Sequence, residues 1–211
     1  MAKRSFLLSI RSFTARILAG LTIQRPVAEN RRPSAQHASA DQMNISARFS
    51  DLPVLHPRLL WEDIIGAAGA IIDVRTPFQF ELAVRDVPGF GSDRLRMTID
   101  PGEVSMSQVE RLRRTFERSR LVELAAIAIA GMGLYYAGGH EIQDIALRGS
   151  AADYLVDHSG HLLEIAGRSR RSDLTAAFEQ RWLRLSKTTS GGFYVCAVEF
   201  ESLAGQLAFH P

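Results

Sequence analysis

The stretch 121-LVELAAIAIAGMGLYYAGG-139 is followed by three strand-like segments, 140-HEIQDIALRG-149, 150-SAADYLVDHSG-160 and 161-HLLEIAGRS-169. The first stretch is long and apolar enough for a buried helix, and Glu123 is its only charged residue. A helical pattern at 171–187 and a β-rich segment, 191-GGFYVCAVEF-200, come next. This order predicts an α/β fold in which helices flank a mixed sheet, with a core of helix, three strands, helix and strand.

Two acidic residues, Asp153 and Glu164, lie in the second and third of these strands. Side chains alternate along a strand, so the loop between the two strands decides whether the acids share a face. A two-residue turn at 159–160 sets them diagonally and a four-residue loop at 157–160 sets them directly opposite, within roughly 5–8 Å between Cβ atoms. A three-residue loop would separate them. Because two such close carboxylates repel each other, the pair predicts a site for a hard divalent cation such as Mg²⁺ or Mn²⁺.

Glu123 is a third candidate for this site, since a lone carboxylate in an apolar helix is costly unless something binds it. The alternative is that Glu123 lies at the helix start, where the helix dipole favours an acid. Two weaker signals follow. Phosphate groups could contact Arg168, Arg170 and Arg171, although these residues also suit an ordinary charged loop. A metal could bind the side chains of Asp157, His158 and His161, although a solvent-exposed turn is the preferred interpretation of these residues.

This arrangement resembles the PD-(D/E)XK nuclease-like superfamily over about residues 119–201. That superfamily has a core of helix, three strands, helix and strand, the restriction-endonuclease-like fold. The resemblance implies Mg²⁺-dependent cleavage of DNA. It also implies that Glu123, Asp153 and Glu164 are catalytic carboxylates, and that Asp153 and Glu164 bind the metal.

One position departs from the superfamily pattern, which on the third strand is an acid, any residue and then lysine. Here the third strand has Glu164-Ile165-Ala166, so alanine occupies the lysine position. Some members supply this function from the next helix, where Gln180, Arg181 and Arg184 lie in this chain. The departure favours a second hypothesis, in which the chain is a catalytically inactive nuclease-like protein that acts as an interaction or assembly module with a protein partner.

The charge pattern predicts two regions. Residues 1–49 hold eight of the 25 Lys and Arg residues but only two of the 23 acids, so the rest of the chain is slightly acidic. We expect 1–48 to be a disordered basic tail and linker, and 49–211 to form a single α/β domain. Within that domain, 49–102 is a β-rich lead-in that contains a hairpin, and 103–211 is the nuclease-like core. The lack of a broad basic field argues against non-specific nucleic-acid binding.

The location of the protein is predicted from its cysteine content and its N-terminus. The single cysteine, Cys196, excludes an intramolecular disulfide and a thiolate zinc cluster, and it fits a reducing, cytoplasmic compartment. The composition of residues 1–25 leaves three alternatives open, which are an organellar transit peptide, an amphipathic surface segment or translation that starts further downstream. No apolar run in this N-terminal region is long enough to span a membrane.

Overall fold

The structure is a computed structural model that describes residues 42–72, 76–102, 104–146, 150 and 152–211. Most of the predicted tail, residues 1–41, lies outside the described residues, as do residues 1–25, for which a transit peptide was one of three alternatives. The last part of that tail was assigned wrongly, because Gln42–Arg48 forms strand β1 and pairs in parallel with β3. In its sequence, QMNISAR, the apolar residues Met43, Ile45 and Ala47 alternate with polar ones, which is a strand pattern, and pairing with β3 holds the segment in the sheet.

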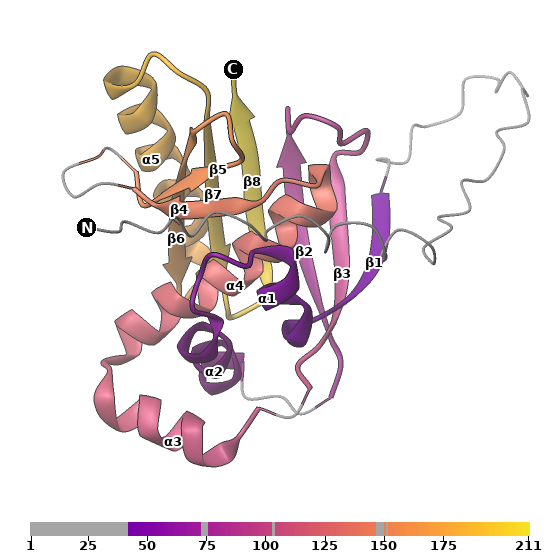
Figure 1. Ribbon diagram of the computed structural model, residues 1–211, viewed down its shortest axis with the longest axis vertical. Coiled ribbons are helices and arrows are strands. Elements are labelled where there is room, and N and C mark those ends of the chain that lie inside the picture. Colours follow the sequence, from indigo (N-terminus) through magenta and orange to yellow (C-terminus); the bar gives the residue numbers. More distant parts are fainter. Residues whose placement is uncertain (1–41, 73–75, 103, 147–149, 151) are drawn as a thin grey trace, which may run out of the picture. The chain divides into compact units, whose positions relative to one another are not determined.

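Eight strands form one mixed sheet in the order β1-β3-β2-β8-β7-β6-β5-β4 (Figure 1). The strands are β1 (Gln42–Arg48), β2 (Phe78–Arg85), β3 (Arg94–Asp100), β4 (Ile142–Ile145), β5 (Tyr154–Val156), β6 (His161–Arg168), β7 (Phe193–Glu199) and β8 (Ala204–His210). The predicted hairpin is confirmed as the antiparallel pair β2 and β3. The last strand, β8, lies between β2 and β7 and therefore joins the lead-in and the core into one sheet.

Helices cover both faces of the sheet, which confirms the predicted α/β class. The helices are α1 (Leu52–Leu55), α2 (Trp61–Ile72), α3 (Met106–Thr115), α4 (Arg118–Gly138) and α5 (Leu174–Thr188), with 3-10 turns η1 (Phe49–Asp51) and η2 (Arg171–Asp173). On one face α4 packs against β6 and β7 and is covered by α2, and α5 packs on the other face (Figure 1). The lead-in is therefore not only β-rich, since α2 occupies twelve of its residues.

The apolar helix α4 lies between the sheet and α2, which explains its composition. A Cβ atom at Gly133 would lie 2.6 Å from the Leu82 side chain, so glycine allows the helix to approach the sheet closely. Among the described residues α4 is the one helix with the length and composition of a membrane span, and 72% of its most apolar window is buried inside the protein. The core helix of a folded domain has the same properties.

The element order in the second half of the chain is α4, β4, β5, β6, α5 and β7. The first three strands are antiparallel neighbours, whereas β6 and β7 are parallel and are connected through α5. Strand β5 is shorter than β6, and its pairing with β6 ends where Tyr154 meets Leu163. The rest of β6, on the side facing away from β7, has no paired strand among the described residues. The free edge of β6 that results is where the candidate site lies.

Candidate functional site

The three predicted acids surround one cavity of about 350 Å³, which we call the main cavity. It lies at the free edge of β6 and is bordered by α4, by the start of β5 and by α5. Its charged lining residues are Arg120, Glu123, Asp153, Glu164, Arg168 and Arg181. The cavity therefore combines three carboxylates with three guanidinium groups. Helix α4 and strand β6 each contribute one residue of both kinds, α5 contributes Arg181, and Asp153 precedes β5.

The hairpin of β5 and β6 brings Asp153 beside Glu164. Its pairs run from Val156–His161 to Tyr154–Leu163, so the connecting loop has four residues, Asp157–Gly160. Continuing this register by one residue sets Asp153 directly opposite Glu164, where paired side chains share a face. The amide group of Ile165 donates a hydrogen bond of 3.2 Å to Asp153 Oδ2, which fixes the orientation of that carboxylate.

Glu164 is a buried carboxylate between two arginines of α5. Its residue is 7% exposed, Arg181 Nε lies 3.4 Å from its Oε1 atom, and Arg184 forms a second ion pair with the same oxygen. Burial raises the pKa of Glu164, the negative charge of Asp153 raises it further, and the two arginines oppose both effects. Without another cation, two arginines are therefore the groups that stabilise the charged form of this carboxylate.

Asp153 and Glu123 are more accessible than Glu164. Asp153 is exposed, and its charge is the second cause, after burial, that raises the pKa of the neighbouring Tyr154 to about 12. Glu123 is 56% exposed at its side chain and forms a 3.0 Å ion pair with Arg120. It lies in the second turn of α4, which begins at Arg118, so the helix dipole has little effect on it. Glu123 was a candidate because burying a lone carboxylate in an apolar helix is costly, and its exposure removes that argument.

The predicted phosphate-binding arginines occupy different places. Arg168 lines the main cavity, and its Nη1 atom donates a 2.7 Å hydrogen bond to the carbonyl oxygen of Gly167. Arg170 lines a second cavity that adjoins the main one. Arg171 lines neither of these cavities, and its amide group donates to the Glu201 carboxylate at 2.9 Å. Of the three arginines proposed from the sequence, two therefore line one of these cavities.

Two further arginines were missed as primary candidates. Arg120 precedes Glu123 by three residues, a spacing that pairs side chains on one helix face and could have identified it. Arg181 was named only as a possible replacement for the missing lysine. The side chain of Ala166 is 1% exposed and belongs to the apolar cluster beneath α5, so this position itself contributes no charge to the cavity.

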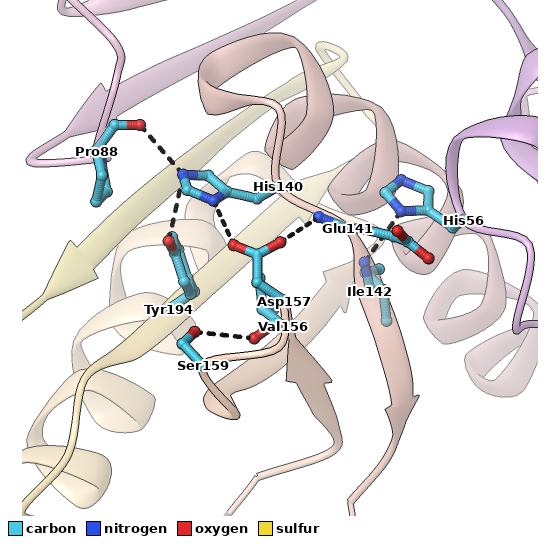
Figure 2. Close-up of polar contacts among 9 residues, drawn as sticks. All are labelled: His56, Pro88, His140, Glu141, Ile142, Val156, Asp157, Ser159 and Tyr194. Carbon is cyan, nitrogen blue, oxygen red and sulfur yellow. Dashed lines mark hydrogen bonds and ion pairs between the residues drawn. The ribbon is translucent and has the colours of Figure 1, made fainter. Parts of the chain in front are cut away.

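A second polar cluster lies at the other end of the β5–β6 hairpin, and Figure 2 shows its contacts. His140 Nδ1 lies 2.7 Å from Asp157 Oδ2, while its Nε2 atom faces the Pro88 carbonyl oxygen at 3.1 Å and the Tyr194 hydroxyl at 3.3 Å. The other Asp157 oxygen accepts a 2.7 Å hydrogen bond from the amide group of Glu141. This cluster ties the hairpin loop to the start of β4, to the β2–β3 loop and to β7.

The alternative metal set of Asp157, His158 and His161 does not form. Both carboxylate oxygens of Asp157 are engaged with His140 and Glu141, and the His161 ring packs against Tyr194 and Phe209. In the part of the chain that the structure describes, no three His, Cys, Asp or Glu side chains are arranged to hold a metal ion. A cation in the main cavity would therefore have to bind to two carboxylates, with water or a ligand completing its coordination.

Comparison with known proteins gives no relative. No family model matches the sequence, and neither curated proteins nor solved structures contain a match. The geometry of the main cavity is therefore the basis for the function proposed below.

Proposed function

We propose that the chain is a Mg²⁺-dependent phosphodiester hydrolase of the PD-(D/E)XK nuclease-like type that acts on DNA. The observation that carries this proposal is the convergence of Glu123, Asp153 and Glu164 with three arginines on one cavity. Hydrolysis of a phosphodiester needs both charges, because carboxylates bind a cation and guanidinium groups bind the phosphate. Helix α4 and strand β6 each supply one residue of both kinds.

The two facing carboxylates fit the requirements of a magnesium ion. Mg²⁺ is commonly bound through one or two carboxylates, with waters and substrate phosphates as its remaining ligands. Asp153 and Glu164 are directly opposed, and mutual repulsion is one reason why the pKa of Glu164 is raised. A bound cation would supply charge stabilisation on the phosphoryl oxygen and activation of a water molecule. Glu123, on the accessible rim, would be the third carboxylate.

The chain order supports the same type of protein. The segment from α4 to β7 runs in the order helix, three strands, helix and strand, with its third and fourth strands parallel, and this order supports the proposal of a restriction-endonuclease-like core. Asp153 and Glu164 occupy the second and third of these strands or the residue next to them. In this scheme Arg181 takes the place of the missing lysine, because of the two arginines paired with Glu164 it is the one that also lines the main cavity, 3.4 Å from that acid.

One observation favours a second function, a catalytically inactive nuclease-like interaction module. The carboxylate of Glu164 already pairs with Arg181 and Arg184, so its charge is compensated without a metal. Arginine remains protonated and is a poor proton-handling substitute for lysine. In this alternative the cavity is a remnant of an active site, and the partner is a protein.

Thermal melts with and without Mn²⁺, beside cleavage assays on plasmid and single-stranded DNA, distinguish the two functions. The hydrolase predicts that Mn²⁺ stabilises the folded protein by RT ln(1 + [L]/Kd) and so raises its melting temperature, and that Asp153→Asn abolishes both this shift and cleavage. Asp93→Asn is the matched control, because Asp93 is exposed and directly precedes β3, which three strands of the sheet separate from β6. If wild-type protein shows neither a metal shift nor cleavage, the interaction module is the better proposal.

A further inference from the structure

The main cavity continues into a second cavity of about 360 Å³. The two share Glu123, Gly167 and Arg168, and the second is bordered also by Arg170 and Ser169. Each volume lies near the lower end of the range for small-molecule sites, about 300–1,000 Å³, so each has room for a group the size of one nucleotide. We propose that the two cavities form one groove that binds a single strand of DNA, and not a duplex, across two neighbouring phosphates.

The depth of Glu164 in this groove excludes a duplex from productive binding. Glu164 is 7% exposed, so a phosphate reaches it only by entering the main cavity. The phosphates of a duplex are held on the outside of a stiff double helix, and neighbouring sugars and the opposite strand prevent one of them from entering such a recess. A single strand rotates freely about its backbone bonds and can follow the groove. This inference rests on the proposed function, namely that the site acts on DNA.

The shape of the groove follows from the free edge of β6. Beyond the last β5 pair at Tyr154–Leu163, no strand of the described residues pairs with β6 on this side, and the two cavities lie along this edge at Glu164–Arg168. On its far side α4 comes so close that a Cβ atom at Gly167 would lie 2.4 Å from the Val122 carbonyl oxygen. This contact sets the next residue, Glu123, at the junction of the two cavities.

The charges in the groove match a short footprint. Arg120, Arg168, Arg170 and Arg181 line the two cavities, whereas residues 50–211 together have fewer bases than acids. Duplex-binding proteins commonly neutralise about 6–10 phosphates, which requires a longer basic surface. Arg168 and Arg181 also repel each other, and the buried Arg181 Nε atom has a 3.4 Å ion pair with Glu164 but no hydrogen-bond partner among the described residues. A phosphate between these two arginines would relieve both conditions.

Fluorescence anisotropy of the full chain with labelled DNA tests the groove. The probes are a short oligothymidylate and a blunt duplex of the same length, in Ca²⁺, which takes the same kind of oxygen ligands as Mg²⁺. We expect the single strand to bind at least tenfold more tightly than the duplex. We also expect Arg170→Ala to weaken single-strand binding severalfold and to reduce the slope of log K against log salt by about 0.7, the value for one phosphate contact.

Arg94→Ala is the matched control, since Arg94 lies on β3, which β2, β8 and β7 separate from β6. Equal or tighter binding of the duplex, an unchanged affinity of Arg170→Ala, or no binding of the single strand would each overturn the groove. The binding assay does not depend on cleavage. Single-strand binding without hydrolysis would therefore contradict the proposed hydrolase and support the groove. Metal-dependent cleavage with equal binding of both probes would support the hydrolase and contradict the groove.

Discussion

Replacing Gly167 with alanine tests the contact that holds α4 against β6. The added Cβ atom would lie 2.4 Å from the Val122 carbonyl oxygen, 2.8 Å from its carbonyl carbon and 2.9 Å from its Cγ1 atom. Two of these three atoms belong to the backbone, so a change of rotamer cannot relieve the overlap. Either α4 moves away from the strand or the strand bends, and both changes separate Glu123 from Arg168.

The expected loss of stability follows from the size of this overlap. Adding a methyl group to a well-packed core costs about 1–3 kcal/mol. Alanine also restricts the unfolded chain, which offsets about 0.4–1 kcal/mol of this loss. For a domain of this size, 1 kcal/mol corresponds to a change of about 2–4 °C in melting temperature, so we expect Gly167→Ala to lower it by up to about 10 °C.

Gly191→Ala is the matched control, because a Cβ atom at Gly191 would meet no atom within 4 Å. This variant should melt at the wild-type temperature or slightly above it. Both proteins are compared by circular dichroism melts and by urea unfolding. If Gly167→Ala has the same melting temperature and urea midpoint as Gly191→Ala, then α4 does not pack against β6 as closely as the structure indicates. The position of Glu123 in the groove is then wrong as well.

Three other predictions concern the hairpin, the buried acid and the chain start. Asp157→Asn keeps the backbone shape but removes the charge that faces His140, and we expect it to reduce the free energy of unfolding by about 1.5–3 kcal/mol, measured by urea titration. Because the pKa of Glu164 is raised in the folded protein, its ionisation favours unfolding. Stability should therefore fall as pH rises from the ordinary value of 4.5 through the raised pKa, and melts of Glu164→Gln against pH should lack this fall. Deleting residues 1–41 should leave the melting temperature unchanged, whereas deleting 1–48 should lower it, because the second deletion removes β1.

The second half of the chain could be predicted from sequence because its signals are local. The apolar length of α4, the short apolar run of β6 and the helical spacing of α5 each identify their element without knowledge of the rest. The hairpin loop was limited to a few lengths, and two of them set Asp153 and Glu164 on one face. The sequence could not choose between these two, because turn residues suit several loop lengths.

The missed elements depend on distant contacts. β8 has the sequence AGQLAFH, in which small residues weaken the strand pattern, and it is stabilised by pairing with β7 and β2. α2 contains two glycines that lower its helix propensity, and its packing against α4 compensates for them. The role of Arg120 was missed for a related reason, since its importance depends on where α4 meets the cavity.

The arginines in the main cavity connect the two proposals through competition for one carboxylate. Arg181 pairs with Glu164, the same side chain that would bind a cation, and it repels a metal ion through its own charge. A phosphate placed between Arg168 and Arg181 would draw these guanidinium groups toward itself and leave Glu164 free for the metal. DNA and cation should then each increase the affinity of the other, and by linkage the two increases must be equal. An inactive module that binds only a protein partner has no such coupling, because Arg181 would remain paired with Glu164 whether or not that partner is bound.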